Sequence, residues 1–341
     1  MIDKKESLTY DDVLLVPQYS DIESRKEIDV GNDLDKNIHL ELPIISAPMD
    51  TVTGIDMVMA MDQLGGLGII HRYNSIEEQV SLAATAFSAS VVGAAVGVTG
   101  DFEERACALY DVGVDVICID VAHGHHSLVK KALETLRGIF GDSTHLMAGN
   151  VATSEGYKAL SDWGADSIRC NVGGGSICST RIQTGHGVPG LQTIMDCAQY
   201  KMGRAKIIAD GGIRNSGDMV KALAAGADFV MVGSLLAGTD QSPGEVMHDK
   251  SGLRRKVYRG MASKEAQFDW RGEFSSNEGI STTISYKGDI KVVLNDMANG
   301  LRSGLSYSGC RNLLELQENA IFLRQTSSGL AESRTHILRS K

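Results

Sequence analysis

Eight short apolar segments recur along this chain at a nearly regular interval, and this repeat constrains the fold more than any other feature of the sequence. Most of them start about 20 to 30 residues after the previous one, and about 40 residues separate the sixth from the seventh. Their Val, Ile and Ala content is typical of strands that are buried on both faces. They cover residues 42–48, 67–70, 91–98, 114–120, 145–151, 166–172, 206–213 and 228–234.

Most intervals between these segments contain a stretch with the pattern of a helix, such as residues 54–65, 154–164 and 216–226. Strands that alternate with helices at this spacing indicate a parallel sheet, and eight such units indicate a (β/α)8 TIM barrel. The alternative, a doubly wound open sheet, predicts a glycine fingerprint after the first strand. The first segment is followed by no GxGxxG. We therefore expect an α/β protein in which residues 1–341 form one barrel domain.

The composition supports a large core and argues against some kinds of partner. Hydrophobic residues make up 43% of the 341 residues, and the net charge of −10 disfavours binding to nucleic acids or anionic membranes. The six cysteines form no CxxC pair, the N-terminus lacks the apolar region of a signal peptide, and no apolar run approaches a membrane span. These features predict a cytoplasmic protein with reduced thiols.

Catalytic groups of such barrels lie at the C-terminal ends of the strands. The wide interval after the sixth strand contains GGGSICSTR (residues 173–181), which we expect to be an insertion at this face. About 100 residues follow the eighth strand, more than a closing helix needs. Among them, the polar segment 258–279 is expected to be irregular and to form a mobile flap that extends to about residue 290.

Cys178 follows three glycines in this insertion and lies outside any apolar segment. Because glycines let backbone amides approach a ligand, a cysteine in such a loop is a candidate nucleophile. The alternative is a small buried hydrophobic residue. The hydroxyl of Thr180 is a candidate to relay a proton, with Glu278 in the flap as its partner base, although a loop glutamate is more often simply solvated.

Two dipeptides that contain glycine predict a phosphate site. Gly211-Gly212 and Gly233-Ser234 follow the seventh and eighth strands, where barrels bind phosphate, and each precedes a segment expected to be helical. Together with Ser176 they favour binding of an anion, and the alternative is that they only form tight turns. Asp120 and Asp210 lie at the ends of the fourth and seventh strands and are candidates either to bind sugar hydroxyls or to cap the following helices.

The three histidines that follow the fourth strand, His123, His125 and His126, raise the question of a metal. Their spacing fits no standard zinc pattern, and no cysteine or carboxylate partner is nearby in the sequence. We therefore expect no metal at this cluster.

Taken together, these motifs resemble the family of IMP dehydrogenase and GMP reductase, nearly from end to end. The resemblance is carried by long and specific segments: LTYDDVLLVPQYS (8–20), ISAPMDTVT (45–53), GAAVGVTGD (93–101), DVAHGHH (120–126), AGNVAT (148–153), GGGSICSTR (173–181), ADGGIRNSGD (209–218), GSLLAGTDQSPGE (233–245) and YRGMAS (258–263). It implies a (β/α)8 barrel that forms a homotetramer, acts on a purine ribonucleotide and uses a nicotinamide cofactor.

The resemblance also implies roles for individual residues. Cys178 matches the nucleophile that attacks C2 of the purine, and Thr180 and Glu278 match the other catalytic groups. Backbone carbonyls of Gly173, Gly175 and Cys178 match a site for a monovalent cation, potassium in the dehydrogenases. The nicotinamide side matches Asp120, Val121, Asn150 and Arg169. The substrate side matches Met49, Ser176, Asp210, Gly212, Gly233, Ser234, Tyr258, Gly260, Met261 and Gly279.

Several features favour the reductase, which converts GMP to IMP and ammonia with NADPH. The flap lacks the Arg-Tyr pair with which dehydrogenases activate water, the nearest dipeptide being Trp270-Arg271, and EFSSNEG (273–279) resembles the reductases' segment. The regulatory CBS domain of most dehydrogenases would be inserted near residues 75–92, where only about 17 residues stand.

Other features favour the alternative, an IMP dehydrogenase that makes XMP with NAD and water and lacks the CBS domain. DVAHGHH, GTDQSPGE and SSGLAES (327–333) resemble bacterial dehydrogenases. The loop also departs from the family at Gly174, where Pro or Ser is frequent, and at Ser179, where Thr is common, and we expect these changes to loosen it. Two further alternatives are a catalytically silent nucleotide sensor and an enzyme for a modified or deoxy guanine nucleotide.

Overall fold

The computed structural model describes residues 6–86, 88–201, 203, 205–275 and 277–335. Eight parallel strands close into a barrel in which each pairs with the next along the chain and the last pairs with the first. This confirms the predicted TIM barrel, and every strand lies within a predicted segment. The strands are β4 (Ile44–Ser46), β5 (Leu67–Ile70), β6 (Gly93–Val96), β7 (Val116–Asp120), β8 (His145–Val151), β9 (Ser167–Cys170), β10 (Lys206–Asp210) and β11 (Phe229–Val232).

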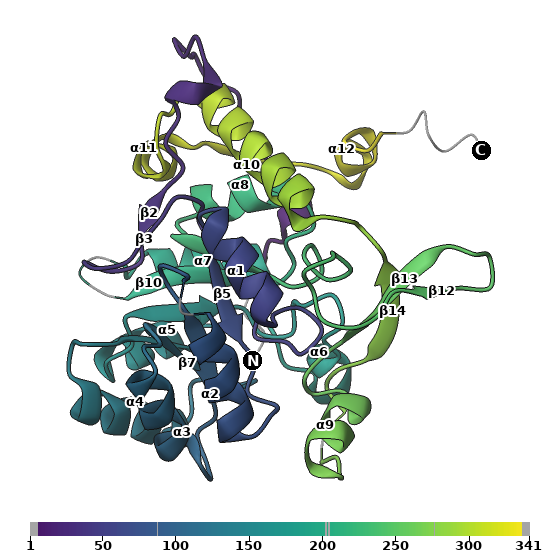
Figure 1. The fold of residues 1–341 in the computed structure, drawn as a ribbon. Helices are drawn as coiled ribbons and strands as arrows, with labels where there is room; N and C mark the ends of the chain where they lie inside the picture. The colour runs from purple at the N-terminus through teal and green to yellow at the C-terminus, as the bar shows by residue number, and fades with distance from the viewer. Residues whose placement is uncertain (1–5, 87, 202, 204, 276, 336–341) are drawn as a thin grey trace.

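Helices connect the strands and cover the outside of the barrel (Figure 1). Helix α2 occupies the place where a regulatory insertion would stand, so this part of the chain is an ordinary barrel unit. Helix α10 packs along α8 after the eighth strand. The connecting and closing helices are α1 (Ile55–Gln63), α2 (Ile76–Thr85), α3 (Phe102–Asp111), α4 (Ser127–Phe140), α5 (Ser154–Asp162), α6 (Thr180–Thr184), α7 (Gly190–Ala198), α8 (Ser216–Ala224) and α10 (Ile290–Tyr307).

Local sequence explains where several of these helices begin. Ser75 and Glu78 form a reciprocal capping box at the start of α2, and the side chains of Thr153, Asn215 and Asp289 cap α5, α8 and α10. Each cap satisfies a backbone N–H that the first turn of a helix leaves without a partner.

The core has two parts, one inside the barrel and one between the barrel and its helices. The inner part contains alternate strand residues such as Ile45, Met147 and Phe229, and is joined by Leu34 and Leu40 of the hairpin formed by β2 (Asn32–Asp33) and β3 (His39–Leu40). Because the barrel interior is filled with side chains, a ligand is admitted only at its mouth. No helix among the described residues is long and apolar enough to cross a membrane.

The segments outside the barrel repeat form two accessory structures. Strand β1 (Val13–Leu15) pairs with β15 (Phe322–Arg324), which joins the two ends of the chain near the short helices η1 (Tyr10–Asp12), η2 (Arg25–Glu27), α11 (Leu313–Asn319) and α12 (Ser327–Glu332). The antiparallel strands β12 (Met247–His248), β13 (Arg254–Arg259) and β14 (Ser281–Ser285) extend from one side of the barrel (Figure 1).

The flap connects β13 with β14, and it corrects one expectation. Most of residues 258–279 were expected to be irregular, yet Lys264–Arg271 form the helix α9. Ser263 caps this helix and Gly272, with a φ of 73°, ends it. Polar composition misled the prediction because most of this helix faces solvent, whereas only Ala266 and Gln267 are buried.

Candidate active site

A pocket of about 400 Å³ opens at the C-terminal ends of the barrel strands, a size suited to a small-molecule ligand. Every residue that the sequence nominated lines it, although those residues come from loops far apart in the chain. They are Met49, Asp120, Val121, Asn150, Arg169, Gly173, Gly175, Ser176, Cys178, Thr180, Asp210, Gly212, Gly233, Ser234, Tyr258, Gly260, Met261, Glu278 and Gly279.

Cys178 lies in the insertion between β9 and β10, partly exposed to the pocket. Its thiol donates a hydrogen bond to the hydroxyl of Thr180, with 3.1 Å between Sγ and Oγ1. Its backbone N–H donates to the carbonyl of Gly175 over 3.1 Å, so one of the three carbonyls expected to hold a cation also takes part in the turn of the loop. The thiol and the hydroxyl are thus in contact before any substrate binds.

The loop is packed more tightly than its departures from the family pattern suggested. A Cβ atom on Gly174 would lie 2.1 Å from Nδ2 of Asn171, so no side chain fits there without moving its neighbour. Asn171 in turn donates to the carbonyl of Gly211 over 3.3 Å, and its own carbonyl accepts from Asn150 over 3.0 Å. The glycine therefore allows close packing between the loop and Asn171.

Backbone hydrogen bonds hold the flap against the loop of Cys178. The N–H of Ser179 donates to the carbonyl of Glu278 over 2.8 Å, and the N–H of Ile280 donates to the carbonyl of Ile177 over 3.1 Å. The hydroxyl of Ser179 donates to the carbonyl of Asn277 over 2.9 Å. Cys178 and Gly279 consequently face each other across an antiparallel bridge, which brings Glu278 to the wall of the pocket.

Helix α9 of the flap is fastened to the barrel by side chains that sequence analysis missed. The rings of Tyr73 and Trp270 stack with centroids 4.2 Å apart. Arg259 donates to Asp269 over 2.5 Å and to Asp50 over 2.6 Å, which links the flap to the loop after β4. The only sequence signal for the stacked pair was that Trp270 is one of two tryptophans in the chain.

Two arginines in the same pocket were also not nominated. The guanidinium groups of Arg72 and Arg271 lie 5.7 and 5.6 Å from the ring of Trp270. Arg271 donates to Gln267 over 2.8 Å and to Ser275 over 2.7 Å, whereas Nε of Arg72 is buried without a hydrogen-bond partner among the described residues. The pocket therefore has a cationic, aromatic wall on its flap side.

A polar and charged network joins four neighbouring strands, β7 to β10, at the floor of the pocket. Arg169 donates to Asp120 over 2.5 Å and to Asp210 over 3.0 Å, and Asn150 donates to the same oxygen of Asp210 over 2.8 Å. Burial lowers the pKa of the Arg169 guanidinium, but Asp210 and Asp120 outweigh it and raise that pKa well above its ordinary value. Arg169 is therefore permanently charged and is the cation of this network.

Neither aspartate caps a helix, so the structural alternative for them does not apply. His126 caps α4 and Asn215 caps α8. The contacts of Asp210 with Arg169 and Asn150 all fall on Oδ2. This leaves Oδ1 of Asp210 as the oxygen that these contacts do not use.

The residues predicted to bind the phosphate lie together where β10 and β11 end at the pocket. The hydroxyls of Ser176 and Tyr258 are 3.2 Å apart, and burial raises the pKa of the Tyr258 phenol, so it stays protonated. Gly212 has a φ of 78°, which favours glycine, and is followed by helix α8 as predicted. Gly233-Ser234 is followed by hydrogen-bonded turns over residues 234–238 instead of the expected helix.

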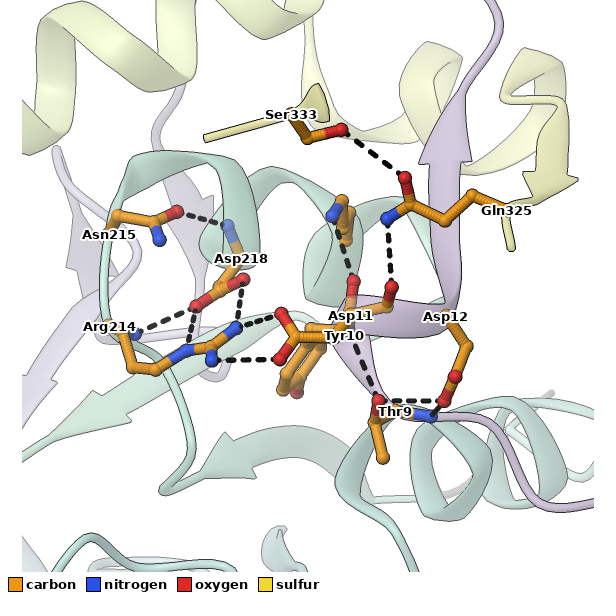
Figure 2. A network of polar contacts seen from close by, with 10 residues as sticks. Thr9, Tyr10, Asp11, Asp12, Arg214, Asn215, Asp218, Gln325 and Ser333 are labelled. Atoms are coloured by element: carbon orange, nitrogen blue, oxygen red, sulfur yellow. Dashed lines mark hydrogen bonds and ion pairs between the residues drawn. The ribbon is translucent and has the colours of Figure 1, made fainter. Parts of the chain in front are cut away.

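Residues of the N-terminal segment pack against the loop that contains Gly212. Figure 2 shows the guanidinium of Arg214 between two carboxylates, with Asp11 at 2.5 Å and Asp218 at 2.9 Å. The ring of Tyr10 is buried beneath the loop, and a Cβ atom on Gly212 would lie 3.7 Å from it. The N-terminal segment 8–20 thus packs against the loop that follows β10, a contact that its sequence did not reveal.

The histidine cluster has structural contacts instead of ligand geometry. The ring of His125 lies 5.9 Å from that of Trp163, and His126 caps α4 through a hydrogen bond from Leu128 N–H of 3.1 Å. Within the described part of the chain, no three His, Cys, Asp or Glu residues are grouped so that they could hold a metal ion.

Comparison with protein families identifies one match, the IMP dehydrogenase / GMP reductase domain, over residues 7–336. Curated relatives carry both names. An inosine-5'-monophosphate dehydrogenase from Nitrosopumilus maritimus is 34% identical over 470 aligned positions, covering 97% of this chain and 98% of the relative. A GMP reductase from Leishmania major is 31% identical over 478 positions, covering 97% of each. Both alignments exceed the 341 residues of this chain, so these relatives contain segments that it lacks.

Among solved structures, one similar fold is a cysteine-to-alanine variant of GMP reductase from Trypanosoma brucei in complex with guanosine 5'-monophosphate. The TM-score is 0.91 at 30% sequence identity, with 97% of this chain and 98% of that chain covered. The identities to the two named groups are similar, so overall similarity does not separate the two activities.

Proposed function

The chain belongs to the IMP dehydrogenase / GMP reductase family of oxidoreductases, and we propose that it is a GMP reductase. In this proposal it converts GMP to IMP and ammonia and uses NADPH as the reductant. The observation that supports it most is the hydrogen-bonded attachment of Glu278 to the loop of Cys178 and Thr180. This attachment places a carboxylate, a hydroxyl and a thiol on the wall of one pocket.

Those three groups suit the removal of an amine from a purine ring. The thiolate of Cys178 forms a bond to C2 of GMP, which turns one difficult substitution into two easier steps. Thr180 and Glu278 deliver the proton with which the 2-amino group leaves as ammonia. The sulfur remains bonded to C2 until the thiolate is expelled and IMP is released.

The phosphate and the ribose are held far from the reacting carbon, by Ser176, Tyr258, Gly212 and Ser234 on one side and by Asp210 on the other. Binding energy from these remote groups orients C2 at the sulfur. Only Oδ1 of Asp210 is available for a ribose hydroxyl, because its other oxygen is occupied by Arg169 and Asn150.

The nicotinamide side of the pocket has unsatisfied polar atoms that fit a dinucleotide. Oδ1 of Asn150 and Nε of Arg72 are buried without a hydrogen-bond partner among the described residues, which provides one acceptor and one donor. When bound, the cofactor supplies the hydride that takes the place of the amine at C2. Asp120, Val121, Asn150 and Arg169 would hold it, and Arg169 keeps the Asp120 carboxylate in position.

A second candidate function, IMP dehydrogenase, is favoured by one observation. Arg271 lines the pocket from the flap, as a group that activates water would have to do. However, its guanidinium is hydrogen-bonded to Gln267 and Ser275, and the residue directly after it is Gly272 and not a tyrosine. We therefore place this activity second.

A paired assay separates the two activities. One reaction contains GMP and NADPH, and the other contains IMP, NAD and potassium; both are followed by nicotinamide absorbance and by analysis of the nucleotide product. Consumption of NADPH with release of ammonia supports the proposal. Formation of NADH and XMP overturns it in favour of the dehydrogenase, and Arg271 is then the first residue to substitute. Tight nucleotide binding without turnover points to a sensor or to a modified guanine nucleotide.

We extend the proposal to a cytoplasmic homotetramer, and to a monovalent cation at the carbonyls of Gly173, Gly175 and Cys178. Light scattering of the purified protein measures the first. Replacement of potassium by a large organic cation in the same assay measures the second, and an unchanged rate argues against the cation site.

A further inference from the structure

The phosphate side of the pocket contains no positively charged side chain. The cations that line the pocket, within the described residues, are Arg72, Arg169 and Arg271. Arg169 is paired with Asp120 and Asp210, and the other two lie beside Trp270 on the flap side. A phosphate monoester carries nearly two negative charges at neutral pH, so hydroxyl and amide groups alone would have to stabilise this charge.

A lysine lies directly behind this side of the pocket. Lys287 follows strand β14, and its ammonium group donates hydrogen bonds to the carbonyl oxygens of Ser234 and Leu235, the latter over 3.0 Å. Ser234 lines the pocket. The ammonium group therefore contacts the main chain of a nominated phosphate ligand, although Lys287 is not itself among the residues that line the pocket.

Lys287 has no ion-pair partner among the described residues, which is unusual for a half-buried cation. Two acidic residues of the neighbouring segments already accept hydrogen bonds from other groups. Asp240 accepts from the hydroxyl of Tyr286 over 2.6 Å, and Asp289 caps helix α10. The loop that Lys287 contacts, residues 233–237, contains no titratable side chain, and Tyr258 on its other side is neutral.

We propose that Lys287 supplies the positive charge of the phosphate site and acts through the peptide group that joins Ser234 to Leu235 instead of touching the phosphate. The other peptide group that it contacts is already committed, because the N–H of Leu236 donates to the carbonyl of Gly233 over 3.0 Å. A cation at the oxygen end of a peptide group strengthens the dipole whose N–H end can face an anion. Lys287 is thus a positioning residue for the substrate. The inference rests on the proposed function, because it takes the nominated groups to be a phosphate site.

This arrangement explains why an unpaired ammonium group is tolerated. Burial lowers the pKa of Lys287 to about 8, so the empty pocket disfavours its charge. A bound phosphate brings the missing counter-charge and raises that pKa again. By linkage, nucleotide affinity must fall as the pH rises above about 8, when the empty site loses the proton.

A second buried lysine provides a matched control. Lys256 donates to the carbonyl oxygens of Thr239 and Ser242 over 3.1 and 2.5 Å, at the far end of the same series of turns. Its pKa is also lowered by burial. It supports the same segment of chain without contacting Ser234, so a purely structural role would give the two lysines the same effect on ligand binding.

The test measures dissociation constants of GMP and guanosine by calorimetry for the wild-type protein, Lys287→Met, Lys287→Arg and Lys256→Met. We expect Lys287→Met to weaken GMP binding about tenfold or more while guanosine binding changes less than twofold. Lys256→Met should change the binding of both ligands by the same factor. Guanosine shares the purine and the ribose, so the ratio of the two constants isolates the phosphate.

The pH dependence provides a readout that does not require the methionine variant to fold. Between pH 7 and 10, the preference of the wild-type protein for GMP over guanosine should fall with a midpoint above 8, and that of Lys287→Arg should stay constant because arginine remains charged. A wild-type preference that Lys287→Met retains, or that does not change with pH, overturns the role of Lys287. A wild-type protein without any preference for GMP instead overturns the phosphate site and the proposed function with it.

Discussion

The backbone N–H of Ser179 donates to the carbonyl oxygen of Glu278 over 2.8 Å, so the flap is hydrogen-bonded to the residue that follows the candidate nucleophile. The two residues are almost 100 positions apart in the chain. The same stretch of the flap that makes this main-chain bond also contributes Glu278 to the wall of the pocket.

Replacement of Cys178 by alanine should abolish turnover and leave nucleotide binding largely intact. The thiol forms the covalent bond in the proposed mechanism, whereas the contacts to the phosphate and ribose come from other loops. Steady-state kinetics and equilibrium binding of GMP measure the two effects separately. Undiminished turnover in this variant would rule out covalent catalysis by Cys178.

Glu278→Gln should lower kcat by about 10²- to 10⁴-fold, the range expected for loss of a general acid or base. The backbone bond from Ser179 remains in this variant, so the flap should still close. Glu273→Gln is the matched control, because Glu273 is an exposed carboxylate in the same flap segment. Equal rates in the two variants would remove Glu278 from the mechanism.

Arg169→Met should destabilise the fold by up to about 3 kcal/mol, because it leaves two partly buried carboxylates, 18% and 13% exposed, without their cation. Urea unfolding at pH 7 measures the loss of stability. Arg137→Met, which breaks the more exposed 2.5 Å pair with Asp166, should cost clearly less; a similar cost would mean that the floor network is not strongly coupled.

Asp11→Asn should cost less than about 1 kcal/mol of stability, since Arg214 is half exposed, but should weaken GMP binding several-fold by loosening the Gly212 loop. The hydrogen bond from Arg214 holds the pKa of Asp11 below its ordinary value. The stabilisation is therefore present above the unfolded pKa of about 4 and is lost as the pH falls through the lower folded value.

Unfolding at pH 7 and pH 3, together with GMP binding at pH 7, tests this account. The control is Asp21→Asn, which removes a comparable 3.0 Å pair with Arg311 in the same N-terminal region. It should leave GMP affinity unchanged. An equal loss of affinity in both variants would show that the pair with Arg214 has no particular connection to the loop.

The stacking of Tyr73 on Trp270 should stabilise the packing of helix α9 against the barrel. In a Trp163→Phe background, Trp270 is the only tryptophan, and its quenching by acrylamide reports the exposure of the flap. Tyr73→Ala should remove about 0.5–1.5 kcal/mol of docking energy and increase quenching. Tyr110→Ala, which breaks a stack with Phe140 remote from the flap, should not change it.

Much of the fold followed from local pattern. Each barrel strand is short and buried on both faces, so it appears in the sequence as an apolar segment, and the helices between them begin at recognisable caps. The helix in the flap was missed because a mostly exposed helix carries little apolar periodicity. The prediction of a helix after Gly233-Ser234 was wrong, because the chain leaves the barrel there and forms an accessory sheet.

Val121, Arg169, Tyr258, Gly260, Met261 and Gly279 were nominated only by the family resemblance, whereas strand-end residues such as Asp120, Asp210 and Gly212 could be predicted because strand ends of a parallel barrel converge on one face. Residues such as Arg72, Tyr73 and Lys287 could not, because their positions relative to Trp270 and Ser234 depend on how distant loops pack. In this protein the order of apolar segments and glycine loops specified the barrel and nominated its candidate reactive groups. Long-range packing set the partners of those groups, because hydrogen bonds and charge pairs between loops depend on distances that sequence spacing does not encode.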